Sequence, residues 1–190
     1  MESKTEHNTL QPTSGLYTKA LLFATEKHAG QKRNSYGVDY ICHCVGVATN
    51  VRRSRCFDEE ILAAALLHDT LEDTATTYEE LVEKFGKKVA DLVKELTNDD
   101  KRKKELGKVK YTEEKFEQMT DEAVFIKLCD MHDNLADTNN CFGNPNELLK
   151  RLNIATALIK KRNGRFDKKV NSWIDEILNV IRREIENTIN

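Results

Sequence analysis

A run of seven apolar residues, 61–67, constrains the fold of this chain more than any other feature. Asp58 precedes the run at a position where its carboxylate accepts hydrogen bonds from the free backbone amides of a first helical turn. A helix over residues 59–69 is therefore predicted, and it is apolar on nearly all sides. Because such a helix is stable only when other elements surround it, we expect it at the centre of the core. The run is far shorter than the roughly 18 to 20 apolar residues of a membrane span, so no membrane association is expected.

The rest of the chain is also predicted to be helical. It contains only 2 Pro and 8 Gly in 190 residues, and 33% of its residues are charged. Scarce helix breakers and abundant Lys and Glu favour helices, and the apolar residues recur at helical spacing. Helices are expected over 16–30, 40–53, 59–69, 77–86, 87–96, 101–119, 121–138, 147–162 and 167–186. The predicted fold class is all-α.

Length, charge and cysteine content bound the organisation of the chain. A chain of 190 residues suits one domain, expected over 15–190, and the polar residues 1–14 are predicted to be a disordered tail. Thirty basic and 32 acidic residues leave a net charge of -2, which does not favour binding to nucleic acid. The amino terminus lacks the apolar core of a secretory signal. Five Cys without CxxC spacing indicate reduced thiols and a cytoplasmic protein.

The predicted core helix ends in two adjacent polar residues, His68 and Asp69. Burying an imidazole or a carboxylate without a partner costs roughly 2–7 kcal/mol, so both must be hydrogen-bonded or bound to a metal. His43 lies in an otherwise apolar turn of the helix 40–53, and Asp130 lies beside the core stripe of the helix 121–138. Two imidazoles and two carboxylates suit Mn²⁺, Fe²⁺ or Zn²⁺. For the pair at 68–69 alone, a hydrogen-bonded core histidine is the simpler alternative.

In this order, the residues resemble the HD metal-dependent phosphohydrolases. The chain is most similar to the hydrolase domain of RelA/SpoT-type alarmone enzymes and to the stand-alone small alarmone hydrolases, including the metazoan ones. The segments that carry the resemblance are HAGQKR (28–33), DYICH (39–43), AALLHDTLEDT (64–74), FG (85–86) and IKLCD (126–130) with Asn134. The set is ordered and extends over most of the chain, so it is far more specific than an isolated HD dipeptide.

The resemblance implies a compact HD-domain helical bundle around one metal site. In such a bundle His43, His68, Asp69 and Asp130 would bind one divalent ion, usually Mn²⁺, with Zn²⁺ or Fe²⁺ as alternatives. The family members remove the 3′-pyrophosphate from ppGpp or pppGpp and return GDP or GTP. The expected partner is therefore a small nucleotide substrate.

The resemblance also implies roles for the residues around the ion. Glu72 and Asp73 match an acidic pair that activates water or protonates the leaving oxygen. Arg33 matches a residue that packs on the guanine ring, and Lys104 matches a lysine that holds phosphate. The expected substrate-binding residues are Lys32, Arg33, Lys104 and Asn134. The basic run 101–110, which includes Lys104, has a solvated helix face as its simpler interpretation.

Departures from the family pattern keep other interpretations open. Asn34 stands where a basic residue is common, Ala136 stands where Arg is common, and no Tyr follows Tyr111. An HD-fold phosphatase acting on NADPH or another phosphorylated nucleotide is therefore the second interpretation, and a nucleotide-binding module without catalysis is the third. The isoleucines of the last helix are expected in the core, with a homodimer seam as the alternative. We do not expect Cys42 and Cys44 to be ligands, because they flank His43 and point to either side of it.

Overall fold

The computed structural model describes residues 15–33, 37–138, 145–161 and 168–189. Within these ranges the regular structure is helical apart from one isolated bridge between Lys32 and Asp39, which confirms the all-α prediction. The predicted tail 1–14 lies outside the described residues. The helices are α1 (Leu16–Lys27), α2 (Ile41–Arg53), α3 (Glu59–Leu67), α4 (Thr70–Asp73), α5 (Tyr78–Phe85), α6 (Lys87–Leu96), α7 (Asp100–Leu106), α8 (Lys108–Gln118), α9 (Asp121–Thr138), α10 (Pro145–Lys161) and α11 (Lys168–Ile189).

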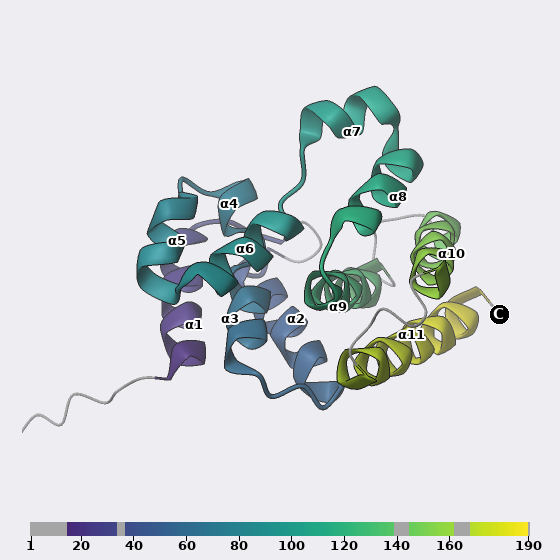
Figure 1. The fold of residues 1–190 in the computed structure, drawn as a ribbon, viewed down its shortest axis with the longest axis horizontal. Coiled ribbons are helices and arrows are strands. Elements are labelled where there is room, and N and C mark those ends of the chain that lie inside the picture. Colours follow the sequence, from purple (N-terminus) through teal and green to yellow (C-terminus); the bar gives the residue numbers. More distant parts are fainter. Residues whose placement is uncertain (1–14, 34–36, 139–144, 162–167, 190) are drawn as a thin grey trace, which may run out of the picture.

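Helix α3 is the centre of the bundle, as its sequence predicts. Its residues 61–67 are all buried, and it packs against α1, α2, α6 and α9. The Asp58 carboxylate caps the helix by accepting from the backbone N–H groups of Glu60 and Ile61. Figure 1 shows α3 enclosed by the helices of the amino-terminal half. The apolar run therefore supplies the surface on which the neighbouring helices are placed.

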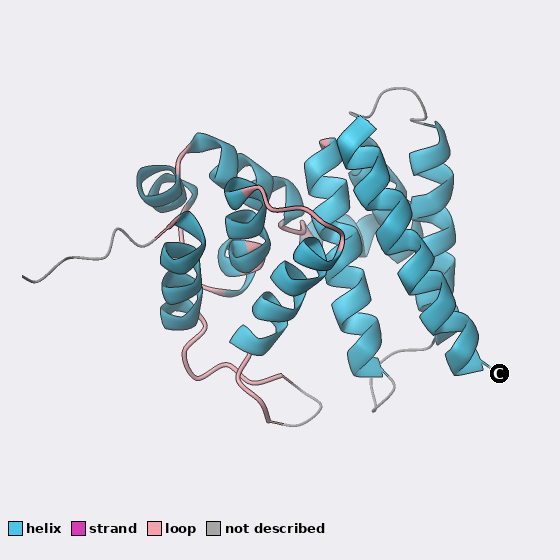
Figure 2. Ribbon diagram, turned by 90° about the horizontal axis from the view of Figure 1, so that it is seen from below, coloured by secondary structure: helices cyan, strands magenta, loops and turns pink. Residues whose placement is uncertain are grey.

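The carboxy-terminal helices form the other side of the molecule. Helix α9 contacts α2 and α11, and α10 contacts α8 and α11. Figure 2 shows these long helices running side by side. Ile174, Ile177 and Ile181 of α11 are buried within the chain, so they belong to the core. The side chain of Ile185 lies outside the described residues, and the homodimer stays a prediction.

The first difference from the expected helices lies at the end of α3. We predicted a helix to 69, but α3 ends at Leu67 and a separate short helix, α4, begins at Thr70. The hydroxyl of Thr70 donates to the carbonyl of Leu67 at 2.7 Å, which caps the helix end with a side chain. His68 and Asp69 consequently lie at the junction of two helices.

The second difference is a break at Gly107, where the prediction of one helix over 101–119 is wrong. Gly107 has a φ of 76°, in the left-handed region that glycine adopts at little cost. Its N–H closes α7 on the carbonyl of Lys103, and α8 then turns back towards α10. Figure 1 shows α7 and α8 rising above the rest of the bundle. The basic run is thus divided between two helices.

Candidate functional site

Three packed segments of the bundle bring the predicted metal ligands together. His43 lies in the first turn of α2, His68 and Asp69 form the α3–α4 junction, and Asp130 lies in α9. Helix α2 packs against both α3 and α9, which directs these side chains towards one point. All four are predicted from the sequence, and the structure places them side by side.

The ligand atoms of these residues have the spacing of a metal site. The Nε2 atoms of His43 and His68 are 3.2 Å apart. Asp69 Oδ2 lies 2.9 Å from Nε2 of His68 and 3.5 Å from Nε2 of His43. Asp130 Oδ1 lies 3.2 Å and 3.8 Å from Nε2 of His43 and of His68 respectively. Adjacent ligands on one ion are roughly 3 Å apart when each metal–ligand bond is about 2.1 Å.

The hydrogen bonds behind the two imidazoles identify their tautomers. His68 Nδ1 lies 2.9 Å from the carbonyl oxygen of Ala65, and His43 Nδ1 lies 2.8 Å from a carboxylate oxygen of Asp133. Both oxygens only accept, so in each neutral ring Nδ1 carries the proton and Nε2 offers a lone pair to the cluster. Two lone pairs and two carboxylate oxygens facing one another repel unless a cation lies between them. The residues therefore fit a divalent ion.

A second layer of hydrogen bonds fixes the carboxylate ligands. Asp130 Oδ2 accepts from Lys127 Nζ and Asp130 Oδ1 accepts from Asn134 Nδ2, both at 2.6 Å. Asp69 Oδ2 accepts from the hydroxyl of Tyr40 at 2.6 Å. Burial, followed by the charge of Asp69, raises the pKa of Tyr40, so its hydroxyl stays a donor. Partners of this kind orient metal ligands.

The electrostatics of the cluster favour a bound cation. Burial lowers the pKa of His43, but hydrogen bonds to the carboxylates, that of Asp130 first, raise it well above its ordinary value. Burial raises the pKa of Asp69, and the charge of His68 and further hydrogen bonds bring it well below the usual range. Lys127 has the corresponding effect on Asp130, lowering its pKa. Both carboxylates are consequently charged near neutral pH.

The structure gives the two acidic residues of α4 different surroundings. Glu72 accepts from Asn98 twice, from the backbone N–H at 2.7 Å and from Nδ2 at 3.2 Å. In the described part of the chain no hydrogen bond is made to the carboxyl group of Asp73, which lies at the solvent side. Partial desolvation and then the charges of Asp69 and Glu72 raise the pKa of Asp73. Glu72 is therefore anchored by Asn98, whereas Asp73 is exposed and has a raised pKa.

The predicted nucleotide contacts lie around this cluster but differ in character. Arg33 donates to the Asp133 carboxylate at 2.7 Å, and the same carboxylate is bonded to His43, so Asp133 links Arg33 to His43. The side-chain amide of Asn134 donates to the carboxylate of Asp130, one of the proposed metal ligands. Lys32 is exposed and forms an ion pair with Asp39.

A cavity of about 90 Å³ adjoins the cluster between α7, α8 and α9. Two of its lining residues touch the site: Lys127 contacts Asp130, and Asn98 contacts Glu72. Its complete lining is Asn98, Lys103, Lys108, Tyr111, Thr112, Lys115, Phe116, Lys127 and Met131. The four lysines on its wall give this space a positive charge, although Lys127 already donates to Asp130 and Lys115 to the segment 96–98. Lys103 lines this cavity, whereas the predicted Lys104 is exposed on α7 and does not line it.

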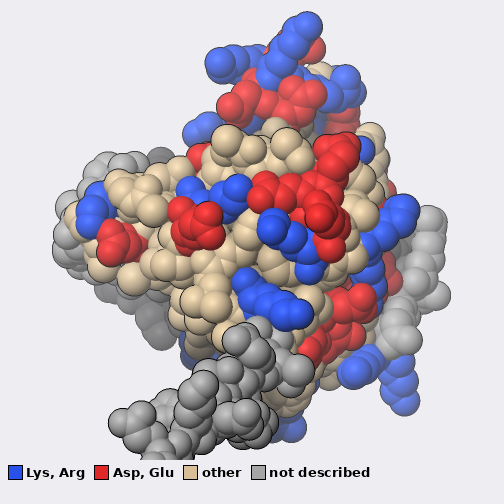
Figure 3. Space-filling model, turned by 90° about the vertical axis from the view of Figure 1, so that its left-hand side faces the viewer, with Lys and Arg blue, Asp and Glu red and all other residues tan. Residues whose placement is uncertain are grey.

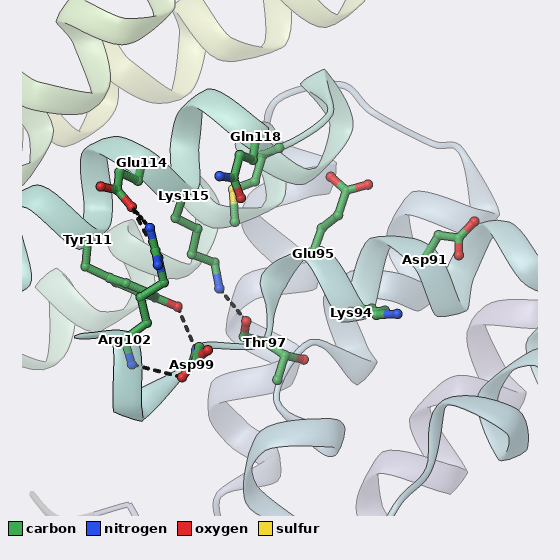
Figure 4. A pocket seen from close by; sticks show the side chains of 11 residues that line it. Asp91, Lys94, Glu95, Thr97, Asp99, Arg102, Tyr111, Glu114, Lys115 and Gln118 are labelled. Atoms are coloured by element: carbon green, nitrogen blue, oxygen red, sulfur yellow. Dashed lines mark hydrogen bonds and ion pairs between the residues drawn. The ribbon is translucent and has the colours of Figure 1, made fainter. Parts of the chain in front are cut away.

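A roomier cavity, of about 510 Å³, lies behind the segment 96–99 and away from the metal ligands. Figure 4 shows Lys115 reaching from α8 towards the carbonyl of Thr97. The Lys115 amine also donates to the Leu96 carbonyl at 2.9 Å and to Asn98 Oδ1 at 3.2 Å. Burial lowers the pKa of Lys115 to about 8. Because the cavity wall mixes acidic and basic residues, we assign it no ligand, and Lys115 supports the loop that holds Glu72.

The surface charges, the helix lengths and the cysteines bear on the remaining predictions. Figure 3 shows acidic and basic side chains interspersed on one face, with no continuous basic surface there. Among the described helices none is long and apolar enough to cross a membrane. Cys44 is buried, and burial raises the pKa of its thiol. In the described chain the group of potential metal ligands comprises His43, His68 and Asp69 with no cysteine, and the Asp130 distances above extend it.

Sequence reasoning missed several residues that support the site. Tyr40, Asn98 and Lys115 act through contacts that depend on how the helices pack. Asp133 is different, because it follows Asp130 by three residues in α9 and therefore lies on the same polar side of that helix. That spacing is a signal by which Asp133 could have been found.

Comparisons with known proteins agree with the geometry. The HD domain family matches residues 20–151. A guanosine-3′,5′-bis(diphosphate) 3′-pyrophosphohydrolase of Aquifex aeolicus is 41% identical over 126 residues, which cover 62% of this chain and only 17% of that protein. The enzyme of the same name, MESH1, from Danio rerio is 40% identical over 63% of this chain and 67% of its own length. Human MESH1 is also 40% identical, with the same coverage.

Solved structures extend the similarity to most of the chain. The structure of a metazoan SpoT ortholog that hydrolyses ppGpp matches with a TM-score of 0.68 and 29% identity, over 87% of this chain and 95% of that one. A Listeria monocytogenes protein shares the fold, with a TM-score of 0.55 at 23% identity. The resemblance and the fold expected from the sequence are thus confirmed. The chain belongs to the HD-domain family, and its relatives include the MESH1- and SpoT-type ppGpp hydrolases.

Proposed function

We propose that this protein is a metal-dependent guanosine-3′,5′-bis(diphosphate) 3′-pyrophosphohydrolase, which converts ppGpp or pppGpp to GDP or GTP and pyrophosphate. The observation that carries the proposal is the convergence of two imidazole lone pairs and two carboxylates, with every imidazole–carboxylate distance between 2.9 and 3.8 Å, beside an acidic pair. Relatives at 40% identity bear this name. We further propose Mn²⁺ as the ion, one ion per chain, and the cytoplasm as the location.

His43, His68, Asp69 and Asp130 would hold the ion. When bound, a divalent ion lowers the pKa of a coordinated water towards neutrality and neutralises charge on phosphoryl oxygens. These residues would fix the ion between elements of the core, while hydrogen bonds from Tyr40, Lys127 and Asn134 orient the two carboxylates. In the proposed reaction a water oxygen forms a bond to phosphorus, and the bond between phosphorus and the ribose 3′-oxygen breaks.

The two acidic residues divide the proton transfers. Glu72 is fixed by Asn98 and its oxygens already accept hydrogen bonds, which suits an ionised group that orients the attacking water and takes its proton. Asp73 has a raised pKa and an open carboxyl group, which suits a donor to the leaving 3′-oxygen. One proton passes from water to Glu72 and another from Asp73 to the 3′-oxygen, and transfer of a proton from Glu72 to the neighbouring Asp73 through solvent would return both groups to their starting states.

The substrate would extend from the ion into two neighbouring regions. The lysine-lined cavity, with Lys103 and Lys127 on its wall, supplies positive charge for phosphate oxygens. Arg33 and Asn134, which lie beside the proposed metal ligands, and the exposed Lys32 would contact the nucleoside. Lys104 is near enough along α7 to add a solvent-exposed charge.

A Mn²⁺-dependent assay across ppGpp, NADPH and nucleoside monophosphates tests the proposal. The expected result is stoichiometric GDP and pyrophosphate from ppGpp, with the highest kcat/KM of the set. Orthophosphate from NADPH with a higher kcat/KM would overturn the substrate and support the nucleotide phosphatase interpretation. Absence of turnover with every nucleotide, in protein shown to bind Mn²⁺, would overturn the hydrolase and favour a binding module.

A further inference from the structure

Asp133 joins the metal cluster to the predicted nucleotide site. Its Oδ2 atom accepts from His43 Nδ1 at 2.8 Å and from Arg33 NH1 at 2.7 Å. Its backbone carbonyl accepts from Arg33 NH2 at 3.3 Å. The side chains of Asp133 and Arg33 are each 15% exposed, and that of His43 is 3% exposed. One largely buried carboxylate oxygen therefore connects two groups with different proposed tasks.

Helix α2 leaves space for the Asp133 side chain at Gly46. Gly46 lies one turn after His43 in α2, and a Cβ added there would lie 1.9 Å from Asp133 Oδ1 and 2.7 Å from its Cγ. Side chains do not approach so closely, so any larger residue at 46 would displace the carboxylate. Glycine in the interior of a helix is disfavoured relative to alanine. The close approach of Asp133 to α2 accounts for its presence.

We propose that Asp133 is a positioning residue that sets the orientation of the metal ligand His43 and of Arg33 with one carboxylate, and thereby couples metal binding to nucleotide binding. The first role follows from the structure of the metal cluster, because the hydrogen bond to Nδ1 keeps Nε2 directed at the ion. The second role rests on the proposed function, in which Arg33 contacts the nucleotide. Since both donors share one oxygen, fixing either donor fixes the carboxylate for the other, and the coupling is reciprocal.

Mn²⁺ affinity, measured by competition with a chelator, tests the first role without any nucleotide. Asp133→Ala is expected to weaken Mn²⁺ binding by about 10- to 100-fold, as is typical when an outer-shell partner is lost. Asp133→Asn keeps the size and one acceptor oxygen, so a smaller loss is expected. Asp91→Asn is the matched control, because Asp91 pairs with Lys87 and Tyr78 at the surface of α6 and should leave affinity unchanged.

Gly46→Ala perturbs the same contact without altering Asp133. In the wild-type background it should weaken Mn²⁺ binding, because the new methyl group displaces the carboxylate. In the Asp133→Ala background the space is vacant, and Gly46→Ala should cause no further loss. A folded Asp133→Ala variant with Mn²⁺ affinity within about twofold of wild type, or losses that multiply in the double variant, would overturn the positioning role. If Asp133→Ala does not fold, Asp133→Asn and Gly46→Ala give the same decision.

GDP, the proposed product, tests the coupling. Its affinity is measured with and without Mn²⁺ for wild type, Arg33→Ala and Asp133→Ala. The increase that Mn²⁺ causes should be several-fold larger in wild type than in either variant. An equal increase in all three proteins would overturn the coupling. If wild-type protein does not bind GDP at all, the proposed substrate fails and the coupling fails with it, while the Mn²⁺ measurement still decides the positioning of His43.

Discussion

The proposed metal-binding half of this site and its proposed substrate-binding half have opposite surroundings. The side chains of His43, His68 and Asp130 are 3%, 1% and 6% exposed and come from helices packed into the core. The side chains of Lys32 and Lys103 are 57% and 36% exposed, on a loop and on the raised helix α7. The proposed metal ligands are thus part of the core, whereas these two proposed substrate contacts lie on surface elements.

The difference has an energetic cause. Each proposed metal ligand is also hydrogen-bonded to a neighbouring residue, and leaving a buried polar partner unsatisfied costs about 1–3 kcal/mol. A change in the metal half is therefore expected to lower the stability of the fold as well as the activity. Surface substitutions usually alter stability by about 0.5 kcal/mol or less. Substitutions among the proposed substrate contacts are therefore expected to cost less stability than substitutions among the proposed metal ligands.

The largest effect is expected for His68→Ala. Loss of this ligand should remove the ion and, with it, several kcal/mol of charge stabilisation, so that kcat/KM falls by about 10³-fold or more. Elemental analysis of the purified protein should show less metal, and circular dichroism should show retained helices. Full metal occupancy with normal turnover would contradict the assignment of the cluster.

The acidic pair comes next. Asp73→Asn removes the proposed proton donor and keeps its size, so kcat should fall by about 10²- to 10⁴-fold while Mn²⁺ remains bound. Glu72→Gln should also lower kcat, since it removes the proposed acceptor of the water proton. The measurement is steady-state kinetics with bound metal determined in parallel. An unchanged kcat with a raised KM would make these residues substrate contacts instead.

Lys103 and Lys104 provide a test of the substrate half alone. Lys103 lines the small cavity, so Lys103→Ala should raise KM for ppGpp by about 10- to 100-fold, the effect of one hydrogen bond to a charged group. The exposed Lys104→Ala should have an effect of about fivefold or less. Both effects should decrease at high ionic strength. A larger effect at Lys104 would show that substrate is bound from the solvent side of α7.

The pH dependence of metal binding tests the raised pKa of His43. A proton and Mn²⁺ compete for the same Nε2 atom, so Mn²⁺ affinity should rise by about tenfold per pH unit until the folded-state pKa is passed. The stability of metal-free protein should change in the opposite direction. The raised pKa contributes stability that is complete below the ordinary value of 6.5 and is lost as pH rises through the folded value.

Chelator competition and urea unfolding across this pH range measure the two trends. Added Mn²⁺ should abolish the loss of stability, because the cation replaces the proton between the carboxylates. Parallel trends in affinity and metal-free stability would contradict the assignment of His43.

Much of the site could be predicted because its polar residues interrupt apolar sequence. His68 and Asp69 directly follow a seven-residue apolar run, so their polarity stands out in the sequence. Asp133 escaped notice because its burial depends on Gly46 in another helix and on an arginine distant in sequence. Asn98 depends in the same way on the packing of α4 against α6.

The basic run shows the other limit of sequence reasoning. Helix-forming lysines on both sides of Gly107 favoured a continuous helix, and the positive φ of this glycine cannot be read from propensity. The direction of the two neighbouring lysines, 103 and 104, differs by about 100° on a helix. Which of them faces the site depends on where α7 lies, so packing decides it.

Titration of chelator-treated protein with Mn²⁺ tests the central claim most directly. The account predicts that fully demetallated protein does not hydrolyse ppGpp, that one ion binds per chain, and that activity returns in proportion to the bound ion. The His68→Ala variant should show neither the binding nor the recovery. Undiminished ppGpp hydrolysis by demetallated protein, or recovery that does not follow occupancy of this site, would contradict the account.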